Sequence, residues 1–419
     1  MTAQSRLVRR RAGTATAITV ALLLAAAATT ASAGADTTTP DDTAPAAPSD
    51  FALDRPLRIG LLMAVPGEDE PSAVSNGFDG SSMAIEEINA AGGIGGQPVE
   101  FFRVSYNIND PAKGRQAFLD ALEEDPDILY GAFGGTGVDA IVTSGLLDEA
   151  AVPFIVYGTP ENRQDSDNGS DWLFQFRSTS RSQAEVATHY AIDELDKSRI
   201  GIMYVDAQLG HYGLEGIHAV LDEAGLEAVA EQSHSTTATD LTSSVLAMQS
   251  ADADIVINWD FPSPLGVQLN QFLQNGLDIP TATGASFASV VNSQLASAEA
   301  ISANPETFGV QGCIGLSTSD DTATTDWVAR YVDTYGYVPD ETSTTSYDAI
   351  YVIADAAAAA QSVEHEDIRE ALATGTLHGT GICQPEYHAD ETGTLSHTAT
   401  IVGVNGDGLL EARDVIEIP

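Results

Sequence analysis

The stretch that decides the fold is Pro126–Pro160, which reads PDILYGAFGGTGVDAIVTSGLLDEAAVPFIVYGTP. A short apolar run leads into the glycine-rich segment Gly131–Gly137. Val138–Glu149 then carries apolar residues at helical spacing, and a second apolar run, Val152–Tyr157, ends in Gly-Thr-Pro. The order strand, loop, helix, strand, loop predicts a parallel β-α-β unit.

Both loops of this unit are candidate binding elements. Parallel strands place their following loops at one edge of the sheet, beside a helix N-terminus. Free backbone N–H groups and the hydroxyls of Thr136 and Thr159 would then converge on one point, which suits a carboxylate or another compact oxyanion. The alternative is that the glycines only form tight turns, and these residues alone leave both interpretations open.

The N-terminal segment has the pattern of a secretory signal. Arginines at positions 6 and 9–11 precede the apolar run Ile18–Ala28 and the small residues Ala31-Ser32-Ala33. That order predicts a signal peptide over residues 1–33, cleaved after Ala33, because the run is too short for a comfortable membrane span. An uncleaved anchor is the alternative. Residues 34–56, rich in Thr, Pro, Ala and Asp, are expected to form a disordered linker.

The charge balance excludes two classes of partner. The chain has 61 acidic and 17 basic residues, and removing a signal with four arginines gives 13 − 61 = −48. Such a surface repels nucleic acid and anionic lipid. The two cysteines, Cys313 and Cys383, favour a disulfide in an exported chain.

Nothing in the sequence predicts catalysis, a cofactor or a metal site. The chain has no Gly-x-Ser-x-Gly elbow, phosphate-binding Gly-Lys-Ser/Thr or His-Glu-x-x-His helix. The glycine cluster Gly92–Gly96 follows a helix and precedes a strand, which is the reverse of the dinucleotide-binding order. The spacings His211/His218 and His388/His397 match no recognised ligand pattern, so these histidines are expected at the surface.

Two series of alternating strands and helices predict the fold class. The first runs from the strand at Leu57–Val65 to the strand Trp172–Arg177, and the second begins at Ser180. Regular alternation at this spacing indicates α/β architecture with two doubly wound parallel-sheet lobes. Helices after residue 325 are expected to return to the first lobe, and the tail from Thr380 to Ile418 is expected to form short antiparallel strands.

The chain resembles the type I periplasmic binding proteins, specifically the branched-chain amino-acid group that serves ATP-driven importers. The likeness runs in order from about Leu57 to the end. The motifs that carry it are Ile59-Gly-Leu-Leu62, Ala84-Ile-Glu-Glu-Ile-Asn-Ala-Ala-Gly-Gly-Ile-Gly-Gly-Gln-Pro98, Gly131-Ala-Phe-Gly-Gly-Thr-Gly137, Val152-Pro-Phe-Ile155 and Ser346-Tyr-Asp-Ala-Ile-Tyr351.

This resemblance implies two lobes joined by three crossings, near Arg177, Gln311 and Gly381, which close on a small solute. Lobe one would comprise residues 57–177 and 312–380, and lobe two residues 178–311 and 381–419. The two cysteines lie beside the second and third crossings, so a Cys313–Cys383 bridge is expected between neighbouring hinge segments.

The resemblance also implies the binding residues. The loops after the third and fourth strands would hold a ligand carboxylate, and lobe two would cover it with an aromatic residue, for which Tyr212 is the match. Phe261 and Asp260 leave the next strand and either face the solute or pack locally. The full set of candidates is Gly135, Thr136, Tyr157, Gly158, Thr159, Tyr212, Asp260, Phe261 and Ser286.

One departure from the family concerns charge. Its amino-acid binders place an acid in the following loop of lobe two, against the ligand ammonium, whereas here Thr283–Ser289 offers only hydroxyls, including that of Ser286. An unpaired buried ammonium is costly. Either Asp260 or Asp206 replaces the acid, or the ligand has no amino group.

The functional expectation is an exported, monomeric solute-binding protein that delivers an amino acid, carboxylate or amide to the permease subunits of an ABC importer. The alternative is a ligand-binding sensor subunit with the same fold. No cysteine precedes Cys313, so no lipid-modified cysteine is expected after the signal.

Overall fold

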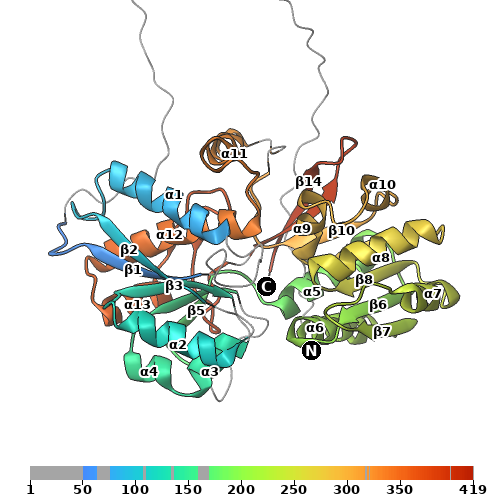
Figure 1. The fold of residues 1–419 in the computed structure, drawn as a ribbon, viewed down its shortest axis with the longest axis horizontal. Helices are drawn as coiled ribbons and strands as arrows, with labels where there is room; N and C mark the ends of the chain where they lie inside the picture. Colours follow the sequence, from blue (N-terminus) through green and yellow to red (C-terminus); the bar gives the residue numbers. More distant parts are fainter. Residues whose placement is uncertain are drawn as a thin grey trace, which may run out of the picture.

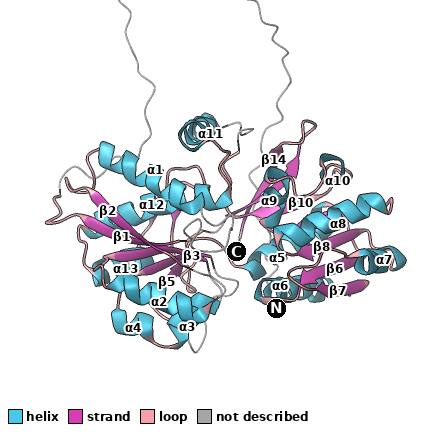
Figure 2. Cartoon of the chain, viewed as in Figure 1, coloured by secondary structure: helices cyan, strands magenta, loops and turns pink. Residues whose placement is uncertain are grey.

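The computed structural model describes residues 51–63, 76–106, 110–133, 136–158, 169–316, 319, 321–396 and 398–418. The predicted signal peptide and most of the predicted linker lie outside these residues. Two α/β lobes, each built on its own sheet, lie side by side (Figures 1 and 2). This arrangement confirms the predicted fold class.

The sheet of lobe one is parallel throughout, with strand order β2-β1-β3-β4-β5. Its strands are β1 (Leu57–Leu62), β2 (Val99–Val104), β3 (Ile128–Phe133), β4 (Phe154–Gly158) and β5 (Leu173–Gln175). A small antiparallel ribbon, β11 (Leu377–His378) and β12 (Glu386–Tyr387), also belongs to this lobe.

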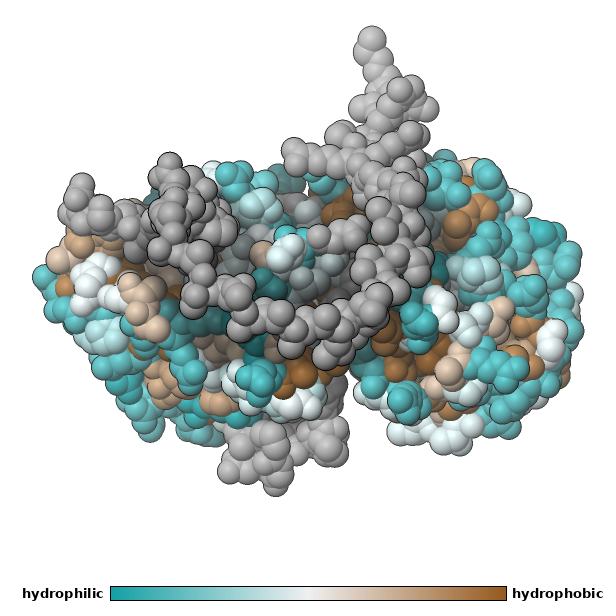
Figure 3. Space-filling model, turned by 90° about the horizontal axis from the view of Figure 1, so that it is seen from above, coloured by the Kyte–Doolittle hydropathy of each residue, from teal (hydrophilic) through white to brown (hydrophobic). Residues whose placement is uncertain are grey.

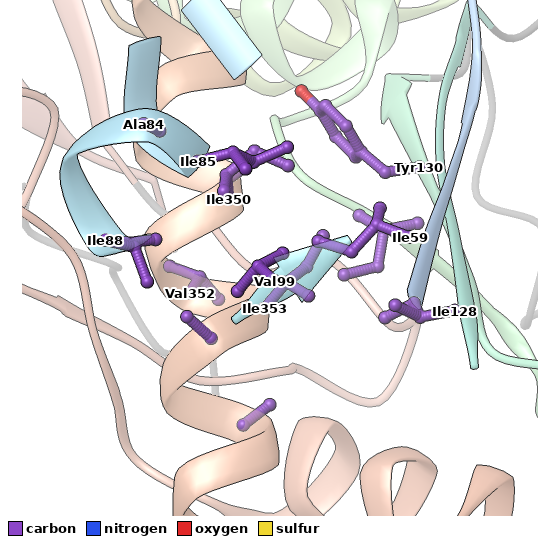
Figure 4. Packing of buried hydrophobic residues seen from close by; sticks show 14 of the residues in the cluster. Ile59, Ala84, Ile85, Ile88, Val99, Ile128, Tyr130, Ile350, Val352 and Ile353 are labelled. Atoms are coloured by element: carbon purple, nitrogen blue, oxygen red, sulfur yellow. The ribbon is translucent and has the colours of Figure 1, made fainter. Parts of the chain in front are cut away.

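Both faces of this sheet are apolar, so helices cover both. Ile128 and Tyr130 point to one face of the sheet and Leu129 to the other, because side chains alternate along a strand. The first face packs on α1 and α12, and Figure 4 shows Ile85 and Ile350 meeting over it. The helices of lobe one are α1 (Gly77–Ala90), α2 (Pro111–Leu122), α3 (Thr136–Thr143), α4 (Leu146–Ala150), α11 (Thr322–Tyr335), α12 (Glu341–Ala360) and α13 (His365–Thr374).

Lobe two has the strand order β14-β13-β10-β9-β8-β6-β7. Five strands are parallel: β6 (Ile200–Val205), β7 (Ala230–His234), β8 (Ile255–Trp259), β9 (Thr281–Thr283) and β10 (Phe308–Gln311). The tail adds β13 (Thr398–Val404) and β14 (Leu410–Glu417) as antiparallel strands, as the alternation of that segment predicts.

Helices also cover the parallel part of this sheet on both faces. They are α5 (Ser180–His189), which continues into the π-helical turn η2 (Tyr190–Glu194), α6 (Gln208–Ala224), α7 (Thr242–Ser250), α8 (Pro262–Gln274), α9 (Ser286–Asn292) and α10 (Ala298–Ile301). Hydrophilic residues cover most of the outer surface visible in Figure 3, as the large excess of acids requires.

The chain passes between the lobes three times. The first passage lies between β5 and α5, and the second lies between β10 and α11. The third passage is later than the expected Gly381, because Tyr387 and Leu395 are buried in the core of lobe one and β13 begins only at Thr398. Turn residues near Gly381 therefore belong to lobe one.

The disulfide Cys313–Cys383 is present, with its Cα atoms 5.0 Å apart. Because Cys383 packs on the core of lobe one, the bridge fastens the second passage to that lobe and does not join two hinge segments. The residue pairing is therefore as predicted, whereas its place in the hinge differs.

A buried ion pair organises the first two passages. Arg177 donates from Nη1 to Glu341 Oε1 at 3.0 Å, and the same oxygen accepts the backbone N–H of Gly312 at 2.7 Å. The Arg177 and Glu341 side chains are only 16% and 7% exposed. One carboxylate at the start of α12 therefore holds both passages against lobe one.

We expect Glu341→Ala to lower the free energy of unfolding by about 3–5 kcal/mol, because it leaves the buried Arg177 charge uncompensated. Urea unfolding measures this loss. The control is Glu185→Ala, which removes the exposed Arg181–Glu185 pair of the same 3.0 Å length and should cost less than about 1 kcal/mol. Equal losses in the two variants would contradict a structural role for the buried pair.

Candidate ligand-binding site

The two predicted binding loops of lobe one begin side by side. Phe133 at the end of β3 is the register partner of Gly158 at the end of β4. Thr136 is exposed and begins α3, three positions after Phe133. Thr136 and Gly158 therefore lie at one edge of the sheet, as the β-α-β unit predicts. Gly135 and Thr159 lie outside the described residues.

Tyr157 and Gly158 are packed against Arg177. The guanidinium carbon of Arg177 is 5.0 Å from the centroid of the Tyr157 ring, and a Cβ atom at Gly158 would lie 2.9 Å from Arg177 Nε. A side chain at position 158 would therefore have to displace Arg177. Burial, reinforced by the negative charge of Glu341, raises the pKa of Tyr157 well above its usual range, so the phenol stays neutral.

The sequence places Arg177 at the end of a predicted strand and, by resemblance, near the first crossing, but it does not assign Arg177 to the binding site. Its pKa is lowered by burial, but the Glu341 carboxylate more than offsets this, so the net pKa is raised and the side chain remains a permanent cation. Its partner is 164 residues away in the chain, so only the folded topology could reveal the pair.

The remaining candidate binding residues lie at the corresponding edge of the sheet in lobe two. Register pairs Tyr204–Trp259 and Asn258–Thr283 show that the loops after β6, β8 and β9 leave from one side of the sheet. Tyr212 is partly buried, Phe261 is 37% exposed, and Ser286 begins α9.

Tyr212 lies on a helix and not on the long loop that its flanking glycines suggest. Helix α6 begins at Gln208 and includes Tyr212. Added Cβ atoms would collide with the carbonyl of Val205 at Gly210, with Trp259 at Gly213 and with the carbonyl of Arg181 at Gly216. Glycines at this spacing therefore allow α6 to pack closely, and they do not interrupt it.

The two edges approach each other across the gap between the lobes. Gln208, the first residue of α6, donates from Nε2 to Asp139 Oδ2 in the first turn of α3 at 3.1 Å. Figure 1 shows α3 and α6 facing each other at this point. The candidate residues of the two lobes therefore lie at the sheet edges that face each other.

Asp260 already has a partner inside lobe two. Its side chain is fully buried, its Oδ2 is 3.0 Å from Nε2 of the nearly buried His234, and its Oδ1 accepts the N–H of Phe261 at 2.7 Å. Burial raises the pKa of Asp260. Burial lowers the pKa of His234, but the Asp260 partner more than offsets this and raises it overall.

The other candidate acid and the candidate hydroxyl of lobe two also have internal contacts. The exposed Asp206 is paired with His211, with Oδ1 2.9 Å from Nε2. Ser286 donates its hydroxyl to the carbonyl oxygen of Asp260 at 2.5 Å. Asp206 and Ser286 therefore both have contacts within lobe two.

Two negative findings apply to the described ranges. Within them, no group of three or more His, Cys, Asp or Glu side chains is arranged to hold a metal ion. The helices there are also too short or too polar to cross a bilayer.

Residues 56–408 match the family model described as periplasmic binding protein, which covers most of the chain. The fold is the type I periplasmic binding protein fold. The chain therefore belongs to the periplasmic binding protein family.

Two relatives from Brucella abortus (strain 2308) are informative. The chain is 27% identical to Leu/Ile/Val-binding protein homolog 7 over 215 residues, which are 49% of this chain and 53% of that relative. It thus matches about half the length of that protein. It is 23% identical to Leu/Ile/Val-binding protein homolog 1 over 316 residues, which cover 75% of this chain and 81% of the relative.

Solved structures share the fold at low identity. A branched-chain amino acid transporter substrate-binding protein from Streptococcus pneumoniae, in complex with isoleucine, has a TM-score of 0.70 and 21% identity, covering 87% of this chain and 100% of that one. A solute-binding protein from R. palustris, in complex with 4-hydroxybenzoate, has a TM-score of 0.72 and 15% identity, covering 87% and 98%.

The Gln208–Asp139 contact provides a test of how the lobes meet. Gln208→Ala should weaken closure, and the affinity for a bound solute should fall by up to about tenfold, because a part-buried hydrogen bond to a charged group contributes about 1 kcal/mol or more. Isothermal titration and small-angle scattering measure the two effects.

The matched control is Gln116→Ala, which removes an exposed amide–carboxylate bond of 2.7 Å to Asp120 within α2 alone. It should leave the affinity and the scattering profile unchanged. If the two variants behave alike, the Gln208 contact has no role in closure.

Proposed function

We propose that this chain is an exported solute-binding protein. It captures a small carboxylate or related polar solute between its two lobes and delivers it to the permease subunits of an ABC importer. The observation that carries the proposal is the facing of the two sheet edges, bridged by Gln208 and Asp139. Parallel strands concentrate loops and helix N-termini at these edges, where small ligands bind in this kind of architecture.

The three passages between the lobes support closure by a hinge. Few segments join the lobes, and two of these passages are held by one carboxylate, Glu341. Short connections of this kind absorb the backbone changes of rigid-body closure. The solute stabilises the closed state only through contacts that the open state lacks.

We infer that the protein binds its solute and does not catalyse a reaction on it. The family consists of binding proteins, and the solved relatives are described as transporter components that hold small molecules. On the side of lobe one, we assign the solute contacts to Thr136, Gly158 and the undescribed Gly135 and Thr159. On the side of lobe two, we assign them to Tyr212, Phe261 and Ser286. Asp260 would act through its backbone, because its carboxylate is paired with His234.

A thermal-shift screen of amino acids, short and aromatic carboxylates, amides and polyamines tests this proposal, since a ligand of the native state raises the melting temperature by mass action. Thr136→Val should then weaken binding of the best hit by about tenfold or more, because a hydrogen bond to a charged group contributes about 1.5–3 kcal/mol.

The control is Thr143→Val at the other end of α3, where the hydroxyl donates to the backbone oxygen of Asp139 at 2.6 Å. Its affinity for the same compound should equal that of the unmodified protein. The proposal fails if no solute in the screen raises the melting temperature, or if both threonine variants bind equally well.

A further inference from the structure

We propose that His234 and Asp260 form a proton-binding site that positions the solute-binding loops of lobe two, so that solute affinity falls when alkaline pH removes the shared proton. His234 ends β7 and Asp260 directly follows β8, on the two sides of β6. The link to solute affinity rests on the proposed function, whereas the proton site rests on the contacts of the pair alone.

The hydrogen positions in the pair follow from what each neighbouring atom can accept. Nδ1 of His234 is 3.2 Å from the backbone oxygen of Ser235, which can only accept, so Nδ1 carries a hydrogen. Nε2 of the same ring is 3.0 Å from Asp260 Oδ2. A bare ring nitrogen and a carboxylate oxygen would repel each other at this distance. One further proton therefore lies between these two atoms, bonded to the imidazole or to the carboxyl group.

Burial makes this proton difficult to remove. The side chains of His234 and Asp260 are only 6% and 0% exposed. With the proton the pair has no net charge, whereas without it a buried carboxylate faces a nitrogen lone pair, which is costly. Burial lowers the pKa of His234, but the Asp260 partner more than offsets this and raises it overall. The proton is therefore retained above the usual range of histidine and is lost as the pH rises further.

The pair holds four segments of the facing edge in place. Oδ1 of Asp260 accepts the N–H of Phe261 at 2.7 Å, and its backbone oxygen accepts the Ser286 hydroxyl at 2.5 Å. The backbone oxygen of His234 accepts the N–H of Asp206 at 2.7 Å. The segments after β6, β7, β8 and β9 thus all meet at these two residues. Because Phe261 and Ser286 are assigned solute contacts, a change at the pair reaches the site through one hydrogen bond.

Other ionisable groups near the pair have contacts of their own. Helices α7 and α8, which pack on this face of the sheet, carry no ionisable side chain. The neighbouring strands, their loops and α6 contribute Tyr204, Asp206, His211, His218, Glu231 and Asp240. The three acids of this set bind His211, His218 and Thr242, respectively, and the Tyr204 ring lies beside that of His211. The proton between Nε2 and Oδ2 therefore belongs to His234 and Asp260.

NMR of ¹⁵N-labelled histidine rings in the complete chain tests the proton site without a solute. The His234 signals, identified by their loss in His234→Gln, should titrate at a higher pH than those of His218. His218 is the matched control, because its exposed ring lies 2.9 Å from Glu231 on the same strand as His234. Titration of His234 at the same pH as His218, or at a lower pH, overturns the inference.

Solute affinity at two pH values, one on each side of the His234 titration, tests the coupling. Isothermal titration with the best compound of the thermal-shift screen should show affinity falling by about fivefold or more at the higher pH. Asp260→Asn can still donate to Nε2 and accept from Phe261, but it has no shared proton to lose, so its two affinities should be nearly equal. His218→Gln should keep the affinity ratio of the unmodified protein.

The outcomes separate this inference from the proposed function. Equal affinity ratios in the unmodified protein and Asp260→Asn overturn the inference and leave the proposed function intact. Absence of binding by every compound at both pH values overturns the proposed function and the coupling, while the ring titration still decides the proton site. If Asp260→Asn does not fold, His234→Gln replaces it, because its amide donates to the Asp260 carboxylate and does not titrate.

Discussion

Burial of both faces of the parallel strands in two sheets is the constraint on which the rest of this structure depends. Strands such as β3 and β4 are apolar on both sides, so each sheet needs a helix layer above and below it. The helices of these layers also connect consecutive parallel strands, so each of these strands runs in the same direction as the one before it. The loops that follow the strands therefore gather at one edge of each sheet, and the chain brings those two edges together at Gln208 and Asp139.

Buried ionisable side chains at the hinge and in lobe two are paired with one another. The chain has few cations for its many acids, yet Arg177 is buried at the hinge beside Glu341. The buried Asp260 is likewise paired with His234. In the proposed function, paired acids of this kind would lie close to the site without repelling an anionic solute.

Much of the fold could be predicted from the sequence because local patterns determine it: apolar runs, helical periodicity and glycine-rich turns. The start of α6 could not, because Gly210 and Gly213 resemble a loop in sequence and serve close packing in the structure. The His234–Asp260 pair depends on the order β8-β6-β7, and the late third passage depends on where Leu395 is buried. Such features follow from tertiary arrangement, which no short segment encodes.

The most direct test of the central claim, that the lobes close on a solute, is the distance between them in solution. Spin labels at Lys113 on α2 and Glu215 on α6, both exposed, report this distance by pulsed electron resonance while the native disulfide stays oxidised. We predict that a solute which raises the melting temperature shortens the distance and narrows its distribution. An unchanged distribution in the presence of a saturating bound solute would contradict the account.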